Sequence, residues 1–331
     1  MHIIDTYLFS NGEGIVMTFQ QLNYLVEISK CGSINKAAQK LFLSQSGISI
    51  AIKELEEELN ITFFIRTNKG VTFTPEGREF LSHAVSLLDS KKRIELMYSN
   101  RSGHTTSTYF SVATQRYPFT QDAFMKFTNL HRDETYRLQF IETGIESVIE
   151  DVSNRSADVG VVSESELTEK IIGKLLDSRE IEFHELFTVK PCVYVKKDHP
   201  LASKDSVTEN DLKDYPYITF EQTEGVAIDF SEECQLFTTE TPARRIIINT
   251  REAAVDLVSV SDAVTTGSGL LVKGISPDGI KSIVIDGQPD IKIGYVVPKD
   301  TALSPLAEEF VNILTDSIRE SIAYTESLRN A

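Results

Sequence analysis

Apolar residues recur at helical spacing along the stretch that follows Met17. Thr18, followed three residues later by Gln21, has the pattern of a capping box, so a helix is expected to begin there and to end near Gly32. Its apolar positions fall on one face, at Leu22, Leu25, Val26 and Ile28. The chain therefore opens on an amphipathic helix.

Two further helices are expected, each preceded by a serine that can cap it. Ser33 precedes residues 34–41 and Ser44 precedes residues 45–59. A serine hydroxyl favours a helix start because it accepts a hydrogen bond from a free backbone N–H. The apolar face of the later helix consists of Ile48, Ile52, Leu55 and Leu59. Two short helices joined by a tight turn have the pattern of a helix-turn-helix.

Four polar residues of the later helix lie off its apolar face: Gln45, Ser46, Ser49 and Lys53. Their amide, hydroxyl and ammonium groups can pair with base edges and phosphates, so they are candidate DNA contacts. The same spacing also fits three helices of any small bundle, with these side chains merely solvated. Helix spacing alone leaves both interpretations open.

Two short alternating runs surround Asn68-Lys69-Gly70 within residues 61–74 and predict a β-hairpin. A basic hairpin beside a recognition helix is a wing, and it would bring Arg66 and Lys69 near the phosphates or the minor groove. Two such cations in a surface turn are, by themselves, more often only solvated. Their position after a helix-turn-helix makes the wing the favoured interpretation.

Thr74, Pro75 and Glu76 combine an N-cap, a proline at the first helical position and an acid in the first turn. A helix is expected from there to about residue 100. Its apolar seam consists of Phe80, Ala84, Leu87, Leu88 and Ile94. A helix of this length in so small a domain predicts pairing with a second copy of the chain. The alternative is packing of the seam against its own domain.

After a short polar hinge at residues 102–107, strands and helices alternate, which predicts an α/β domain over residues 108–331. Strands are expected at residues 109–113, 137–141, 157–162, 187–195, 217–220, 245–249 and 292–297, and helices at 119–130, 145–153, 252–260 and 304–314. The order implies two lobes: lobe I at about 108–187 and 291–318, and lobe II at about 188–290. The fold class is thus an α+β winged domain, a linker helix and a two-lobed α/β domain.

A cleft between two such lobes would be bordered by strand ends and helix N-termini, which offer free N–H groups to a small ligand. The candidate effector-binding residues at these positions are Thr114, Gln115, Thr143, Gly144, Val161, Phe220 and Thr250. Each threonine fits a helix cap equally well. Arg251 could hold a carboxylate, although one arginine at a helix start is more often a surface residue. Glu142, if it faces the cleft, favours a ligand with an amine.

Charge is distributed unevenly along the chain. The 331 residues carry 33 Lys and Arg against 49 Asp and Glu, a net charge of −16, which would oppose DNA binding if it were spread evenly. Residues 17–101 hold 11 Lys and Arg against 9 Asp and Glu, whereas residues 102–331 hold 22 against 38. The acidic excess therefore lies outside the predicted DNA-binding segment.

Several other functions find no support. The three cysteines and six histidines show neither a zinc pattern nor a disulfide framework, and no cofactor or catalytic motif is recognisable. Thr266-Gly-Ser-Gly lacks the lysine of a phosphate loop and fits a turn. The cysteine usage fits a reducing cytosol. No apolar run is long enough to span a membrane, so no membrane insertion is expected. Residues 1–16 lack periodicity and are expected to be a flexible extension.

The first domain resembles the LysR-type transcriptional regulators. The resemblance is carried by FQQLNYLV from residue 19, GSINKAAQKL from 32, LSQSGIS from 43, IKELEEEL from 52, FIRTNKGV from 64 and TFTPEG from 72. The positions that match the family's DNA contacts are Ser33, Gln45, Ser46, Ser49, Lys53 and Arg66. Ile50 departs from the pattern, since many members have arginine or another polar residue there. Operator preference is therefore not transferable.

This resemblance implies a winged helix-turn-helix, a dimerising linker helix and a periplasmic-binding-protein-like effector domain, assembled as a homodimer or homotetramer. The expected partners are operator DNA, a small organic anion or amino acid, and RNA polymerase, with no membrane contact. The rival interpretation is a solute-binding module whose N-terminal helices serve assembly. An enzyme acting in the cleft is a third and poorer interpretation.

Overall fold

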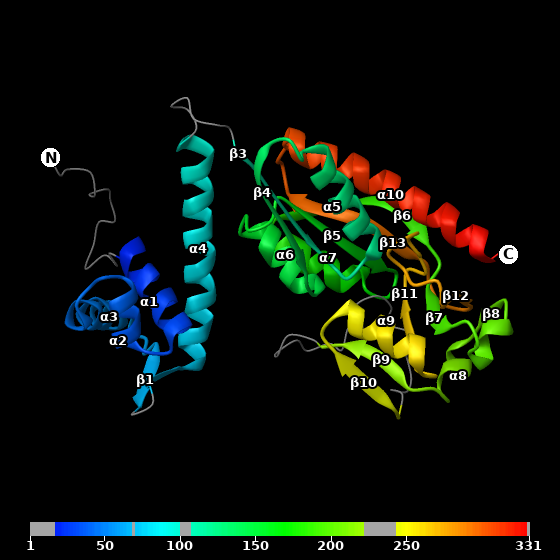
Figure 1. Cartoon of the computed structure of the whole chain (residues 1–331), viewed down its shortest axis with the longest axis horizontal. Helices are drawn as coiled ribbons and strands as arrows, with labels where there is room; N and C mark the ends of the chain where they lie inside the picture. Colours follow the sequence, from blue (N-terminus) through cyan, green and yellow to red (C-terminus); the bar gives the residue numbers. More distant parts are fainter. Residues whose placement is uncertain (1–16, 68–69, 100–106, 222–242, 330–331) are drawn as a thin grey trace. The chain divides into compact units, whose positions relative to one another are not determined.

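The computed structural model describes residues 17–67, 70–99, 107–221 and 243–329. The chain divides into two compact units, Met1–Ser102 and Gly103–Ala331, and each is described by itself (Figure 1). The expected extension 1–16, Lys69 and most of the expected hinge lie outside the described residues. Ser107 at the hinge's end already belongs to a strand.

Three helices and a hairpin form the body of the first unit. The helices are α1 (Phe19–Cys31), α2 (Ile34–Lys40) and α3 (Gln45–Leu59), and strands β1 (Phe64–Thr67) and β2 (Gly70–Phe73) pair antiparallel. The helices start at the predicted caps: Thr18 forms a capping box with Gln21, and the hydroxyls of Ser33 and Ser44 accept N–H bonds. The predicted apolar faces of α1 and α3 pack together with α2 in one core.

The hairpin is held against the turn between α1 and α2. The Val71 N–H donates to the Gly32 carbonyl at 3.0 Å. Gly70 has a φ of +134°, and a Cβ there would lie 2.3 Å from the same carbonyl oxygen. A larger residue would push the strand away, so glycine is required at position 70 for this close approach.

Helix α4 (Pro75–Ser99) shows that the predicted seam has two halves. Phe80 packs on Phe63 with ring centroids 4.7 Å apart, and Ala84 is buried. Leu87 and Ile94, further along, are 45% and 57% exposed. The first half thus packs on its own domain, which was the alternative interpretation, while Leu87 and Ile94 are not part of the described core.

The larger sheet of the second unit has strand order β4-β3-β5-β13-β6, with β13 antiparallel to both neighbours. Its strands are β3 (Ser107–Thr114), β4 (Thr135–Glu142), β5 (Val159–Ser165), β6 (Ile181–Val189) and β13 (Ile291–Pro298). Helices α5 (Pro118–Leu130) and α10 (Pro305–Arg329) cover one face, and α6 (Ile145–Ser153) and α7 (Glu169–Ser178) cover the other (Figure 1). This three-layer arrangement is lobe I.

Lobe II is built on a sheet of order β11-β7-β12-β8 and a parallel pair, β9 with β10. Its strands are β7 (Cys192–Lys196), β8 (Ser206–Val207), β9 (Tyr217–Phe220), β10 (Arg245–Ile248), β11 (Thr265–Gly267) and β12 (Ile280–Ile285). Its helical segments are the 3-10 helix Pro200–Ser203, α8 (Glu209–Leu212) and α9 (Arg251–Val260). Among the described residues, no helix has the length and hydropathy needed to cross a bilayer.

Two sequence predictions about the lobes are wrong. The single strand expected at residues 187–195 is two strands, because the chain passes between lobes at Lys190-Pro191, where proline has no N–H to donate. The last helix does not stop within lobe I. It continues to Arg329, and the Thr325 hydroxyl accepts the Leu271 N–H at 2.8 Å while Tyr324 packs on the lobe II core.

Candidate nucleic-acid interface and effector cleft

The N-terminal half of α3 presents a polar surface. Gln45 and Ser46 are exposed, and Ile48 and Ile52 on the opposite side are fully buried, so the side of the helix that faces solvent is fixed by core packing. Backbone groups at this end are partly satisfied, since the Gly47 N–H donates to the Ser44 hydroxyl at 3.1 Å. The Ser46 hydroxyl also donates to the Ser44 hydroxyl, at 3.3 Å.

The other predicted DNA-contacting residues differ in their exposure and in the partners that they already have. Lys53 is exposed and pairs with Glu57 at 3.1 Å. The half-buried Ser33 accepts the Lys36 N–H at 3.5 Å as a helix cap. The Ser49 hydroxyl oxygen is buried without a hydrogen-bond partner, so this side chain has to rotate before it can contact DNA. Arg66 lies in β1 of the wing.

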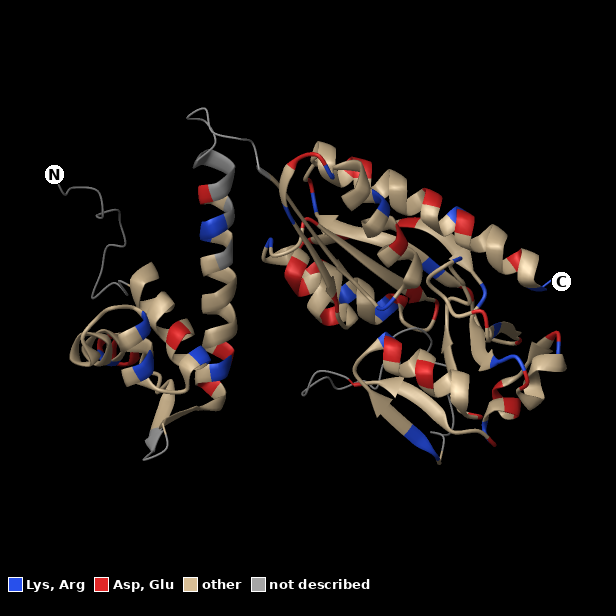
Figure 2. Ribbon diagram, in the orientation of Figure 1, with Lys and Arg blue, Asp and Glu red and all other residues tan. Residues whose placement is uncertain are grey.

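The two units differ in surface charge. Figure 2 shows both signs on the helices of the first unit, whereas acidic residues recur along α6, α9 and α10 of the second. In the first unit, the acidic run after Lys53 is partly structural, because a Glu56 carboxylate oxygen accepts the Phe63 N–H at 2.7 Å. Charge segregation, expected from the residue counts, therefore follows the division into units.

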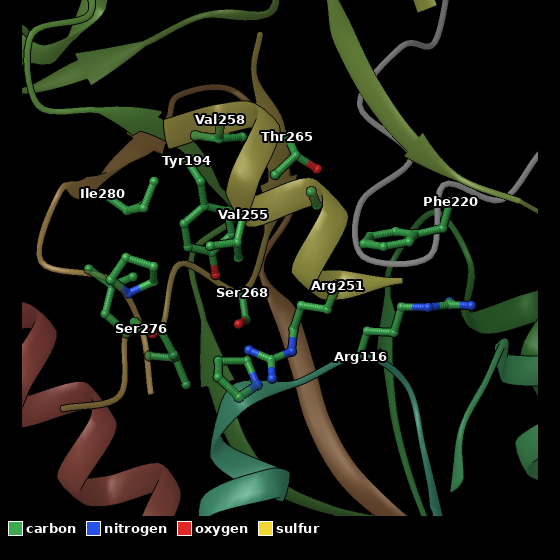
Figure 3. Close-up of a pocket in the computed structure, with 15 residues that line it drawn as sticks. Arg116, Tyr194, Phe220, Arg251, Val255, Val258, Thr265, Ser268, Ser276 and Ile280 are labelled. Carbon is green, nitrogen blue, oxygen red and sulfur yellow. The ribbon is translucent and has the colours of Figure 1, made fainter. Parts of the chain in front are cut away.

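A pocket lies between the two lobes of the second unit (Figure 3). Lobe I supplies Arg116 and Pro118 from the end of β3 and the start of α5. The other lining residues come from β7, β9, α9 and the segments around β11 and β12: Tyr194, Phe220, Arg251, Ala254, Val255, Val258, Thr265, Ser268, Leu270, Leu271, Ser276, Pro277 and Ile280. The lining is largely apolar, with two arginines and a few hydroxyls.

Arg251 connects the lobes. It is the first residue of α9, its Nη2 donates to the Gln121 side chain of α5, and its Nε lies 3.7 Å from a carboxylate oxygen of Glu142. That distance is too long for a hydrogen bond, and both atoms are buried without a hydrogen-bond partner. Burial raises the pKa of Glu142, while the nearby Arg251 charge opposes the shift. The two side chains therefore attract each other electrostatically, and the Arg251 Nε–H and the Glu142 carboxylate oxygen each still have a hydrogen-bonding site that is not used.

Arg116 is the second cation of the pocket. Its guanidinium lies over the Phe220 ring, 4.7 Å from the centroid, and the residue is 9% exposed. A cation over an aromatic face is stabilised by the ring quadrupole. Figure 3 shows Arg116 beside Phe220, whereas the Arg251 side chain runs toward Ser268, so the two cations lie in different parts of the lining.

The predicted effector residues differ in whether they line this pocket. Of the seven, Phe220 lines this pocket. Val161 is instead fully buried in the lobe I core, because its side chain faces α5 and α10. Thr114 is also fully buried, and its hydroxyl donates to the Gln115 carbonyl at 2.7 Å. In this structure, neither the Val161 nor the Thr114 side chain lines the pocket.

The remaining candidates have local roles. The Gln115 side-chain oxygen accepts the Ser163 N–H at 2.8 Å and fastens neighbouring strand ends. Thr250 is the N-cap of α9, accepting the Ala253 N–H at 3.3 Å, as its alternative interpretation held. Thr143 and Gly144 are partly exposed at the start of α6, outside the lining of this pocket.

Sequence reasoning missed Arg116, Tyr194 and Ser268. Arg116 follows the predicted end of β3, residue 113, by three residues, which was a usable signal. Tyr194 and Ser268 reach the pocket through the pairing of β7 with β11. Ser268 belongs to the Gly-containing segment interpreted as a turn. There Gly269 has a φ of +75°, and a Cβ on it would lie 2.3 Å from the Cys192 sulfur, which agrees with close packing.

The thiol of Cys192 is buried, and burial raises its pKa although Arg329 opposes the shift. A buried thiol with a raised pKa is a poor nucleophile. Within the described ranges, no group of three or more His, Cys, Asp or Glu side chains could hold a metal ion.

A winged helix-turn-helix joined to a two-lobed α/β domain with an inter-lobe pocket defines a DNA-binding protein with a ligand-binding domain. The model of the lysR-family bacterial regulatory helix-turn-helix protein matches residues 19–78, and the LysR substrate binding domain model matches residues 113–319. The chain belongs to the LysR family of transcriptional regulators. The rival solute-binding module is not favoured, since its N-terminal domain is the family's regulatory helix-turn-helix.

Relatives cover most of the chain. The transcriptional dual regulator GltC of Bacillus subtilis (strain 168) is 28% identical over 314 residues, 89% of this chain and 95% of GltC. The RuBisCO operon transcriptional regulator of Allochromatium vinosum is 25% identical over 308 residues, 89% of this chain and 94% of its own. These relatives are transcriptional regulators.

Solved structures agree on the fold. The crystal structure of CbnR, a LysR family transcriptional regulator, has a TM-score of 0.59 and 18% identity, and covers 91% of this chain and 99% of its own. Full-length CbnR complexed with its target DNA has a TM-score of 0.58 with the same identity, covering 91% and 100%. The predicted fold class is confirmed.

Proposed function

We propose that this regulator reads its operator with the exposed half of α3 in the major groove and the β1–β2 wing on the adjacent backbone. The observation that carries the proposal is the polar, solvent-facing side of α3 opposite a fully buried apolar side. Gln45 and Ser46 supply donors and acceptors for base edges, while Lys53, Arg66 and Lys69 supply charge for phosphates. Ser33 and Ser49 are assigned lesser roles, as a helix cap and as a hydroxyl that must rotate.

The effector is an organic anion with an apolar body. Support comes from the pocket lining, where Arg116 lies over Phe220, Arg251 is a second cation and mainly aliphatic residues complete the wall. An arginine recognises a carboxylate through charge-assisted hydrogen bonds, and apolar walls desolvate the rest of the ligand. An amino acid is a second candidate, because Glu142 lies 3.7 Å from Arg251 and could accept an ammonium group. Thr143 and Gly144 at the start of α6 are further candidate contacts.

The active form is a homodimer, or a tetramer of two dimers, paired along α4. Support comes from the exposed Leu87 and Ile94 on this long helix. Effector binding would change the relation of the lobes and, through the assembly, the spacing of the DNA-binding units. RNA polymerase is the expected downstream partner, and the bacterial cytoplasm the expected compartment.

A gel-shift experiment tests DNA recognition. Full-length protein is mixed with genomic restriction fragments at physiological salt, with random-sequence duplex as competitor. Specific recognition retains a small subset of fragments when competitor is in large excess, since specific binding exceeds nonspecific binding by about 10³-fold or more. Uniform loss of all fragments with added competitor contradicts the proposal.

A further inference from the structure

Ile50 is an apolar side chain on the polar side of α3. It is 58% exposed, and it lies four residues after Ser46 and three before Lys53, both also exposed. Residues at these spacings share one stripe of a helix. Ile48 and Ile52, two positions away on either side, are fully buried. Ile50 therefore projects from the surface that the proposed function places in the DNA major groove.

Folding does not explain an isoleucine at this position. Ile50 is not a member of the hydrophobic core that joins α1, α2, α3 and the hairpin. A β-branched residue is also slightly less favourable in an exposed helix position than alanine or a long polar residue. Its side chain gains burial only when a partner covers this stripe, and the partner under the proposed function is duplex DNA.

We propose that Ile50 determines specificity by packing on the 5-methyl group of a thymine. In the major groove, base edges carry polar donors and acceptors, and the thymine methyl is the apolar group among them. Isoleucine cannot pair with guanine or adenine acceptors, and it would desolvate them without compensation. Against a thymine methyl it buries apolar surface instead. This inference rests on the proposed DNA-binding function and names the base that one position of α3 reads.

The test removes the methyl group from DNA without changing base pairing. A bound sequence is first selected from a random duplex pool with the full-length protein at physiological salt. Each thymine in it is then replaced singly by deoxyuridine, and dissociation constants are measured for wild type and Ile50→Ala. Val260→Ala, a truncation of another exposed β-branched residue, at the end of α9, is the matched control.

At one thymine position per half-site, deoxyuridine is expected to weaken wild-type binding by about fourfold, the effect of one buried methyl group. Ile50→Ala should bind the thymine and deoxyuridine duplexes equally, and Val260→Ala should behave as wild type. A further duplex carries a cytosine-guanine pair in place of the thymine-adenine pair at that position. Replacing its cytosine by 5-methylcytosine, which returns a methyl group to the major groove, should restore part of the affinity of wild type but not of Ile50→Ala.

The outcomes separate this inference from the function on which it rests. If no sequence is enriched in the selection, the proposed operator recognition fails and the inference fails with it. If a sequence is enriched but every deoxyuridine affects wild type and Ile50→Ala alike, or the sequence has no thymine, the inference alone is overturned. Thermal unfolding of Ile50→Ala should match wild type, because the side chain is outside the core.

Discussion

Individual side chains of the first unit are expected to contact different parts of the duplex. Gln45 presents an amide from the exposed start of α3, which suits a base edge, and Arg66 is placed by β1 in the wing, which suits phosphates. A base contact carries sequence information, whereas a phosphate contact contributes charge regardless of sequence. The two roles can therefore be separated by measurement.

Arg66→Ala should weaken binding to every duplex and lower the slope of log K against log salt concentration by about 1, as expected for one lost phosphate contact. Gln45→Ala should instead change which base pair is preferred at one position, where a mismatch costs ~1–3 kcal/mol. Titrations of operator and single-mismatch duplexes at several salt concentrations measure both. Equal losses on all sequences for both variants would contradict these roles.

Asp151 of α6 is a half-buried acid whose effect on stability depends on pH. Burial, with a smaller contribution from Glu150, raises its pKa from 3.8 to about 6. The folded state thus holds the proton more tightly than the unfolded state, so stability is greatest below the ordinary pKa and falls as pH rises through about 6. At neutral pH the ionised carboxylate destabilises lobe I.

Asp151→Asn should stabilise the second unit at neutral pH by roughly 1 kcal/mol, a figure reduced from the full shift because the group is partly exposed. The gain should vanish below the ordinary pKa of 3.8. Calorimetric unfolding across this pH range measures the effect. Asp133→Asn, at an exposed aspartate, is the control and should leave the stability of the second unit at neutral pH unchanged. A gain that is constant with pH would rule out the explanation.

At the scale of elements, α4 carries an apolar stripe of which only one part is covered. Phe80, Ala84, Leu87 and Ile94 lie on one stripe of this helix, and the domain covers only the first two. The periodicity predicts the stripe but not where the covering domain stops. That end point depends on the positions of α1 and the hairpin, which long-range packing determines.

The double variant Leu87→Lys/Ile94→Lys should raise the dimer dissociation constant by at least about tenfold, since two charged side chains would have to be desolvated on pairing. Val85→Lys, an exposed position on the opposite side of α4, is the matched control and should leave assembly unchanged. Sedimentation velocity measures assembly, and circular dichroism checks folding. An unchanged dimer in the double variant would place the interface elsewhere.

For the molecule as a whole, the pocket and α10 both connect lobe I with lobe II. Arg251 of lobe II contacts Gln121 and Glu142 of lobe I, while Thr325 of α10 accepts a hydrogen bond from Leu271 beyond β11. An anion bound at Arg251 would compete with Glu142 for the same guanidinium. If the proposed effector binds there, ligand binding and lobe arrangement would be coupled through Arg251.

Arg251→Ala should abolish the stabilisation of the second unit by small carboxylates while leaving operator binding without ligand intact. A ligand at 100 times its dissociation constant stabilises a native protein by about 2.7 kcal/mol. Thermal shifts with benzoate, phenylacetate and isovalerate as probes provide the measurement, and Arg132→Ala, at an exposed arginine, is the control. If all variants respond alike to every probe, Arg251 is not the anion contact.

The sequence by itself determined the elements whose information is local. Thr18, Ser33 and Ser44 mark helix starts, and the spacing of Ile48, Ile52 and Leu55 decides which side of α3 is buried, because caps and periodicity act within a few residues. The same local rules predicted most strands of lobe I, and short local motifs carried the family resemblance.

Only the tertiary structure decided which residues line the pocket. Val161 and Phe220 were both predicted at strand ends. Val161 lies within β5 and in the core, whereas Phe220 ends β9 and lines the pocket, because the face of the sheet and the neighbouring lobe determine exposure. Tyr194 and Ser268 reach the same pocket through antiparallel pairing of β7 with β11, strands separated by many residues. Such contacts depend on how distant segments pack, and no local pattern encodes that.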